Sequence, residues 1–301
     1  MKKILRGVFE RLESGVVAVC IGMTHWIDPW IACKIAEAFG ALAFFFMRKR
    51  RRIALENIGR AFGERLSDPE KVILARKSFE SVALSILELF FVRRTRLNYQ
   101  HIFHINGLEY MDQALQEGQG VVLVISHLGS WEYSGFLGLF TKADRYVIVK
   151  NFRNPRVTRQ INELRLVIPT HPIPKDDPGA LREVLRQLRR NNIVAVLIDQ
   201  WSGPSGLWVP FFGQETSTTS LPAKIAARSN SPIVFASCIR ASFGRYEIYF
   251  EPAFHVDLQD PNWEYNTTLA LNKTLERKVR EVPSQWIWGH RRWKAKPAGM
   301  K

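Results

Sequence analysis

The clearest pattern along the chain is a series of short apolar runs separated by longer segments with helical spacing. Residues 121–126, 193–198 and 232–238 are rich in β-branched side chains and too short for typical helices, so we predict that they form buried strands. Between the first two runs, Val184 and Leu188 belong to an apolar stripe with helical spacing. This alternation predicts an α/β fold with a mostly parallel central sheet and helices on both faces.

Other segments have weaker signals. Ser67-Asp68-Pro69-Glu70 is a capping box, which predicts a long helix from there to about Phe91. Alternation at residues 246–250 predicts a strand nearer an edge of the sheet. We also expect a strand at 146–149 and helices at about 131–140, 155–166, 219–229 and 263–281.

The N-terminal region is strongly apolar over residues 14–47. Asp28, Lys34 and Glu37 interrupt it, so no uncharged stretch reaches the roughly 18 residues of a clean membrane-spanning helix. Pro29 predicts a break between two short helices. We expect these helices to lie in the bilayer surface or to dip into it.

A basic cluster, Arg48–Arg52, follows this apolar region directly. Such a cluster beside an apolar segment is typical of contact with anionic headgroups on the cytoplasmic side of a membrane. We therefore predict two parts, an N-terminal membrane-associated helical segment at residues 1–52 and a main domain at residues 53–301.

The overall charge supports an anionic partner. The chain has 43 Lys and Arg against 28 Asp and Glu, which gives a net charge of +15. Nucleic acid, an anionic bilayer and an acidic protein all fit this excess. The basic residues gather beside the apolar N-terminus and near the C-terminus, which disfavours nucleic acid, although a basic nucleic-acid-binding protein is the alternative from another class. The three widely spaced cysteines predict neither a disulfide framework nor a zinc site.

Candidate chemistry follows the first two predicted strands. In open α/β sheets ligands bind beyond the carboxyl ends of the strands, where His127 and Asp199 stand. His127 and Glu132 can meet only if His127 lies in a loop and Glu132 in the first helical turn, and Gly129 and Ser130 suit such a turn. A carboxylate that contacts one imidazole nitrogen leaves the other as a base. We therefore predict that Glu132 orients His127 as a general base.

Several longer motifs accompany His-x4-Glu between about residue 48 and Pro297. They are Arg52 with Asn57-Ile-Gly-Arg-Ala-Phe62, Asn154-Pro155, Asp199-Gln-Trp-Ser-Gly203, Val209-Pro-Phe-Phe-Gly213, Thr218-Thr219 and Pro283-x-Gln-Trp-x-Trp-x-His290-Arg-Arg-Trp-Lys294. His-x4-Glu after an apolar strand resembles the motif of the glycerolipid and lysophospholipid acyltransferase superfamily. The whole set resembles its lipid A late acyltransferase branch, the lauroyl and myristoyl transferases.

The resemblance implies roles for individual residues. His127 would be the general base and Glu132 its partner, in a glycerolipid-acyltransferase-like fold at residues 53–301. A Tyr-Arg pair common in relatives is absent here, although basic residues are kept nearby. Substrate-binding roles are implied for Arg165, Asp199, Lys150 and Arg153.

The implied reaction is transfer of a fatty acyl chain from acyl carrier protein to a hydroxyl of a phosphorylated lipid A precursor. It needs no metal and no organic cofactor. The implied place is the inner membrane, with the catalytic domain facing the cytoplasm and touching its anionic surface. The positive charge of the chain suits an acidic carrier protein. An alternative is an acyltransferase of the same superfamily that acts on a glycerolipid, an aminolipid or another glycolipid.

The C-terminal motif allows two interpretations. Arg291 and Arg292 could bind acceptor phosphates or headgroups, because a guanidinium matches phosphate geometry. We favour a structural or membrane-facing role for this motif, with Trp286, Trp288 and Trp293 packed around it.

Overall fold

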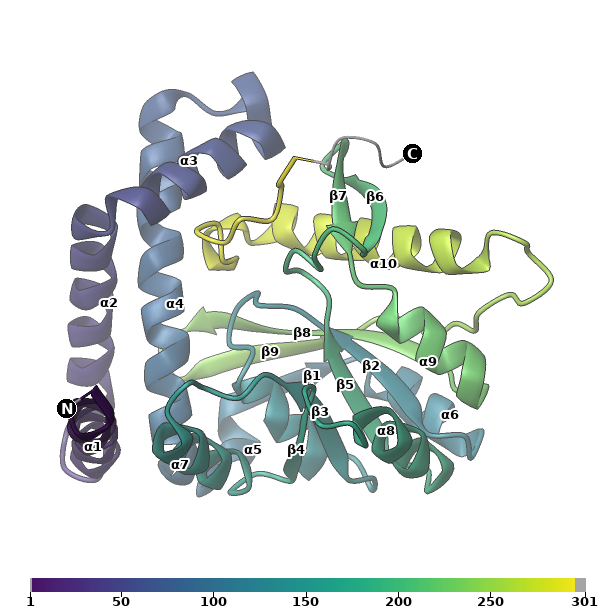
Figure 1. Ribbon diagram of the computed structural model, residues 1–301, viewed down its shortest axis with the longest axis horizontal. Coiled ribbons are helices and arrows are strands. Elements are labelled where there is room, and N and C mark those ends of the chain that lie inside the picture. Colours follow the sequence, from purple (N-terminus) through teal and green to yellow (C-terminus); the bar gives the residue numbers. More distant parts are fainter. Residues whose placement is uncertain (1, 296–301) are drawn as a thin grey trace.

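The computed structural model describes residues 2–295. A central sheet of seven strands has the order β1-β9-β8-β2-β5-β3-β4 (Figure 1). Its strands are β1 (Phe103–Asn106), β2 (Val121–Ile125), β3 (Arg145–Val149), β4 (Thr170–Pro174), β5 (Ile193–Leu197), β8 (Ile233–Ser242) and β9 (Arg245–Phe250). A separate antiparallel hairpin consists of β6 (Leu207–Phe211) and β7 (Gln214–Thr218).

The helices precede, connect and follow these strands. They are α1 (Lys2–Met23), α2 (Pro29–Phe46), α3 (Arg48–Phe62), α4 (Asp68–Arg96), α5 (Tyr99–Ile102), α6 (Leu108–Gln116), α7 (Pro155–Arg165), α8 (Ala180–Arg189), α9 (Leu221–Ser229) and α10 (Trp263–Glu281). Within residues 2–295, 3-10 turns form at η1 (Gly63–Arg65), η2 (Tyr133–Leu139) and η3 (Pro283–Gln285).

The predicted α/β fold with a mostly parallel sheet is confirmed. Every neighbouring pair in the large sheet is parallel except β8 and β9. β9 is the second strand from its edge, and β1 lies outside it. Strands β1 and β4 and the β6–β7 hairpin were not predicted. FHIN, THPIP and QETST lack a continuous apolar run, and LWVPF is apolar but contains a proline, which disfavours a strand.

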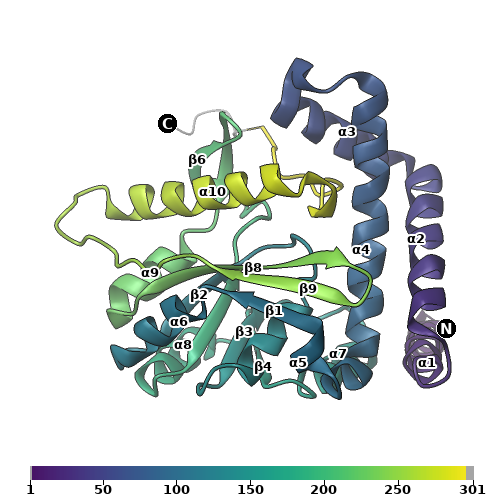
Figure 2. The same cartoon turned by 180° about the vertical axis from the view of Figure 1, so that it is seen from behind.

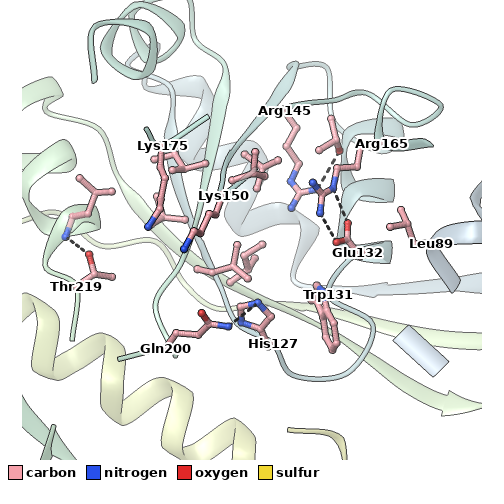
Figure 3. A pocket seen from close by; sticks show the side chains of 18 of the residues that line it. Leu89, His127, Trp131, Glu132, Arg145, Lys150, Arg165, Lys175, Gln200 and Thr219 are labelled. Atoms are coloured by element: carbon pink, nitrogen blue, oxygen red, sulfur yellow. Dashed lines mark hydrogen bonds and ion pairs between the residues drawn. The ribbon is translucent and has the colours of Figure 1, made fainter. Parts of the chain in front are cut away.

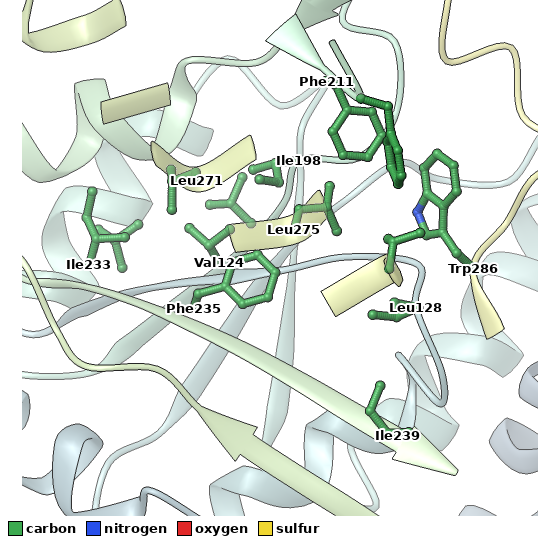
Figure 4. Packing of buried hydrophobic residues seen from close by; sticks show 14 of the residues in the cluster. Val124, Leu128, Ile198, Phe211, Ile233, Phe235, Ile239, Leu271, Leu275 and Trp286 are labelled. Carbon is green, nitrogen blue, oxygen red and sulfur yellow. The ribbon is translucent and has the colours of Figure 1, made fainter. Parts of the chain in front are cut away.

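The sheet is covered on both faces because its strands alternate side chains between two cores. Val122 and Val124 point to a core formed with α8, α9, α10 and the C-terminal tryptophans (Figure 4). Val121 and Leu123 point to the opposite core, formed with α4, α6, α7 and η2. Burial on both faces explains why these strands consist of apolar residues without a polar alternation.

The predicted break at Pro29 is confirmed. Asp28 caps α2 by accepting hydrogen bonds from the backbone N–H groups of Trp30 (2.8 Å) and Ile31 (3.2 Å). The first of the two helices is longer than expected, since α1 begins at Lys2. α2 runs beside α4 (Figures 1 and 2), and a side chain at Gly40 would overlap the backbone of Glu80.

α2 is long and apolar enough to cross a membrane, by length and composition alone. The face of α2 that does not pack on α4 exposes many large apolar side chains. They include Trp30, Ile31, Ile35, Phe39, Leu42, Phe45 and Phe46. An exposed apolar surface of this kind is typical of a contact with lipid or with another protein.

α4 begins at the predicted capping box, where the Glu70 carboxylate accepts hydrogen bonds from the backbone N–H (2.7 Å) and the hydroxyl (2.6 Å) of Ser67. It continues to Arg96, beyond the predicted end. The helix expected at residues 131–140 is wrong in type, because this segment forms the 3-10 turns of η2 after a loop.

Candidate active site

A cavity of about 510 Å³ lies at the carboxyl ends of β2, β3 and β5. One part of its lining is apolar, with Leu89, Ile125, Val147, Val196 and Leu197. The charged part of the lining is mostly cationic, with Arg145, Lys150, Arg165 and Lys175 against Glu132. Figure 3 shows the two lysines on one wall and the two arginines with Glu132 on another. Such a cavity can accept a ligand that combines an apolar chain with an anionic group.

His127 lies in the loop that follows β2, and Asp199 follows β5. These two strands are paired in parallel register, with Ile125 opposite Leu197, so their carboxyl ends are adjacent. The His127 Nδ1 and the Asp199 Oδ1 are 2.8 Å apart. The His127 backbone N–H also donates to Asp199 Oδ2 (2.9 Å).

The Asp199 carboxylate is fully buried and well supplied with hydrogen-bond donors. The Trp286 indole N–H donates to its Oδ2 (3.0 Å). Burial by itself would raise the pKa of Asp199, but the charge and hydrogen bonds of His127 and the indole outweigh it and lower the pKa to about 2. Asp199 is therefore ionised at neutral pH.

This arrangement decides which imidazole nitrogen carries the proton in neutral His127. An ionised carboxylate only accepts hydrogen bonds, so Nδ1 holds the proton and donates it to Asp199. Nε2 is left as the acceptor, with the Gln200 amide nitrogen 3.5 Å away at the cavity (Figure 3). Burial lowers the pKa of His127, but Asp199 and the more distant Glu132 raise it more, and the pKa is raised overall.

The carboxylate of Glu132 does not contact the imidazole, which corrects the predicted His127–Glu132 contact. It forms a two-point ion pair with Arg165 at the end of α7, with distances of 3.0 Å from Nε and 2.6 Å from Nη2. A planar guanidinium with two aligned N–H groups is a stronger partner for a carboxylate than a neutral imidazole. Both residues still line the same cavity as His127.

The loop between His127 and Glu132 is tied to the sheet and to the C-terminal motif. Its backbone N–H groups donate from Gly129 to Gln285 O (3.0 Å) and from Ser130 to Cys238 O (2.8 Å). Gly129 has a φ of 65°, and a Cβ there would overlap the Cys238 carbonyl oxygen. Glycine is thus required for the close approach of this loop to β8.

Two lysines line the cavity where β3 and β4 end. Lys150 was predicted from the sequence, and Lys175 was missed because β4 was not recognised. Val149 pairs with Pro174, and the Lys175 backbone N–H donates to Val149 O (2.8 Å), so the two lysines follow adjacent positions of neighbouring strands. Figure 3 shows both side chains on the same wall of the cavity.

Two other arginines differ in position, because only one of them lines the cavity. Arg153, expected to bind substrate, is exposed and is not part of the cavity lining. Arg145, which was not predicted, is buried in the lining, where it donates to Thr170 Oγ1 (3.2 Å) and Ser134 Oγ (3.0 Å). Burial lowers the pKa of Arg145 to about 10, so it remains a cation at neutral pH.

Much of the C-terminal motif is packed inside the protein, and Arg292 is not free to bind a phosphate, whereas Arg291 is exposed. Arg292 is fully buried and donates to Gln200 O (3.1 Å), Ser217 O (2.9 Å) and Thr218 Oγ1 (2.7 Å). The side-chain amide of Asn57, on α3, donates to Trp288 O (2.8 Å) and His290 O (2.7 Å). These contacts hold the segment around Asp199 in place.

The chain matches a family model described as bacterial lipid A biosynthesis acyltransferase over residues 15–295. Among curated proteins, it is 24% identical to the lipid A biosynthesis lauroyltransferase of Escherichia coli (strain K12), over 96% of this chain and 92% of that protein. It is also 24% identical to the palmitoleoyltransferase of the same strain, over 91% of this chain and 89% of that protein. A more partial match, 23% identical over 64% of this chain and 60% of the relative, is a phosphatidylinositol mannoside acyltransferase of Mycobacterium tuberculosis (strain CDC 1551 / Oshkosh). With nearly its whole length covered by the family model, the chain belongs to the bacterial lipid A biosynthesis acyltransferases.

Proposed function

We propose that this enzyme transfers a fatty acyl chain from acyl carrier protein to a hydroxyl of a lipid A precursor, with His127 as the general base. The observation that carries the proposal is the buried Asp199–His127 pair, which leaves Nε2 unprotonated beside the cavity. Asp199, rather than Glu132, takes the orienting role in this proposal.

The chemistry needs no nucleophile from the protein. His127 Nε2 takes the proton of the acceptor hydroxyl as the oxygen attacks the carbonyl carbon of the thioester. The C–S bond then breaks, an ester forms, and the leaving thiolate receives the proton back from His127. The ionised Asp199 stabilises the imidazolium that exists between these two proton transfers.

The cations of the cavity support a phosphorylated acceptor. Lys150 and Lys175 are neighbours of like charge, and neither ammonium has a carboxylate partner among residues 2–295. Two adjacent like charges are unfavourable until an anion lies between them. Arg165 contributes a further cation, although Glu132 neutralises it in this structure.

We also propose the location and the division of the chain. Residues 1–52 would attach the protein to the inner membrane, with the exposed apolar face of α2 against lipid and Arg48–Arg52 against anionic headgroups. Residues 53–301 would form the catalytic domain on the cytoplasmic side. The carrier protein is acidic, and the net charge of +15 would speed its approach.

The test is turnover of the purified protein with acyl carrier protein thioesters and a lipid A precursor, read by mass spectrometry of the lipid product. We expect His127→Ala to lower kcat by about 10²–10⁴-fold, the usual contribution of a general base. The control is His104→Ala, since His104 is exposed on β1 at the far edge of the sheet. Near-normal turnover by His127→Ala would rule out the proposed role.

The same assay separates the second candidate, which the partial match to a phosphatidylinositol mannoside acyltransferase favours. A mannosylated phosphatidylinositol offered beside the lipid A precursor shows which glycolipid gains mass. If only the mannosylated phosphatidylinositol is acylated, the proposed reaction stands and the proposed acceptor is wrong.

A further inference from the structure

Behind the loop that carries His127, a buried ion pair joins α4 to β8. Arg240 on β8 contacts both carboxylate oxygens of Glu88 on α4, with distances of 2.6 Å from Nε and 3.0 Å from Nη2. Glu88 is 4% exposed, and a hydroxyl from Tyr246 donates to it as well (3.0 Å). Neither charged residue lines the cavity, so this pair is separate from the substrate site.

The pair is connected to the loop through two serine hydroxyls. Ser130 donates to Glu88 Oε2 (2.5 Å) and accepts from Arg240 Nη2 (3.2 Å). Ser85 lies 3.1 Å from the same Nη2 and 2.8 Å from the carbonyl oxygen of Gly129. The residues that separate His127 from Glu132 are therefore held by charged, buried partners from two different elements.

A network of this kind is rigid for a physical reason. Buried charges are unfavourable unless their hydrogen-bonding capacity is filled, so each member strongly prefers the geometry that satisfies the others. Ser130 and Gly129 are also held by backbone hydrogen bonds to β8 and to the segment at Gln285. The loop thus has few alternative positions, and the imidazole at its start remains within reach of Asp199.

We infer that Glu88, Arg240, Ser85 and Ser130 are positioning residues that hold the His127 loop in register with Asp199. The inference rests on the proposed role of His127 as the base. A geometric shift of about 1 Å at a reacting group can lower a rate by roughly a hundredfold. The network therefore affects kcat without touching either substrate.

The arrangement of three serines around one guanidinium provides a matched test. Ser130 lies in the loop, and Ser85 connects Arg240 to it. Ser81, on α4 like Ser85, accepts from Arg240 Nη1 (3.1 Å), and its hydroxyl has no hydrogen bond to the loop in the part of the chain that the structure describes. Each Ser→Ala change removes one buried hydroxyl beside the same ion pair. Ser130 and Ser85 make more hydrogen bonds than the hydroxyl of Ser81, so the melting temperature of each variant is measured and kcat is compared well below the lowest of them.

The expected outcomes differ in catalysis. We expect Ser130→Ala and Ser85→Ala to lower kcat about tenfold to a hundredfold, with KM for donor and acceptor nearly unchanged, and Ser81→Ala to keep its kcat. In Ser130→Ala, the acid limb of the pH–kcat profile should also move to lower pH, because the imidazole is held less firmly against Asp199. A general loosening of the fold would not produce this difference between the serines.

Two results would overturn the inference. One is a normal kcat and pH profile in both Ser130→Ala and Ser85→Ala. The other is an equal loss of kcat in Ser81→Ala, which would show a general loss of stability. A failure of the proposed function is distinguishable, since it appears as activity in His127→Ala irrespective of any serine variant.

Discussion

Replacing Asp199 with asparagine tests the reassigned partner of His127 most directly. The change keeps the size of the side chain and removes one acceptor. In the structure, Asp199 Oδ2 accepts two hydrogen bonds, from the His127 backbone N–H (2.9 Å) and from the Trp286 indole (3.0 Å). The amide oxygen of the introduced asparagine must take this place, because an amide NH₂ group there would face two N–H donors.

The consequence for the imidazole follows from this fixed orientation. The NH₂ group of the new side chain then faces His127 Nδ1, which is 2.8 Å from Asp199 Oδ1 in the wild type. Nδ1 must become the acceptor, the proton moves to Nε2, and the nitrogen beside the cavity can no longer act as a base. The equivalent tautomer reversal in a serine protease triad lowers kcat by about 10⁴-fold, and we expect a loss of about 10³–10⁴-fold here.

The assay is steady-state acyl transfer from a thioester donor. The control is Glu132→Gln, the matched carboxylate-to-amide change in the same cavity. Glu132→Gln weakens the ion pair with Arg165 and leaves the imidazole contact intact, so kcat should fall far less. Thermal denaturation is the control for folding, because lowering the pKa of Asp199 from 3.8 to about 2 stabilises the native state by about 2 kcal/mol. Near-normal kcat in Asp199→Asn with an inactive Glu132→Gln would refute the reasoning and restore Glu132 as the partner.

Two further predictions concern pH and the acceptor. The pKa of His127 is raised above its ordinary 6.5, and only the neutral imidazole is a base. kcat/KM should therefore fall as the pH drops through a value above 6.5, and an acid limb below 6.5 would contradict this. Lys150→Gln combined with Lys175→Gln should raise KM for a phosphorylated acceptor about tenfold or more, with little change for its dephosphorylated form, in the same assay; equal effects on both acceptors would exclude a phosphate contact.

The sheet could be predicted because its central strands are apolar on both faces. VVLVI and IVAVL are buried almost completely, and their shortness and β-branched content favour a strand over a helix. The strands that were missed, β1 and β4, lie at the two edges of the sheet. Residues such as His104 and His171 interrupt their apolar pattern, and β4 also contains two prolines.

The positions of His127 and Asp199 after buried strands were also predictable, but their contact was not. Whether the two strand ends are adjacent depends on the order of the strands in the sheet. β3 and β4 come between β2 and β5 in the chain, but in the sheet they lie on the far side of β5, so β5 is the direct neighbour of β2. Sequence distance favoured Glu132, five residues from His127, over Asp199, which is 72 residues away.

The choice between the two carboxylates follows from what surrounds each of them. Asp199 meets its donors at a buried point where the C-terminal motif supplies the Trp286 indole and the loop supplies a backbone N–H. Glu132 points to the wall formed by α7, where Arg165 satisfies both of its oxygens. An imidazole that must gain and lose a proton needs a partner that stays ionised in both states, and the low pKa of Asp199 ensures this. Glu132, in turn, neutralises Arg165, so Lys150 and Lys175 are the lining cations to which we assign the phosphate of the proposed acceptor.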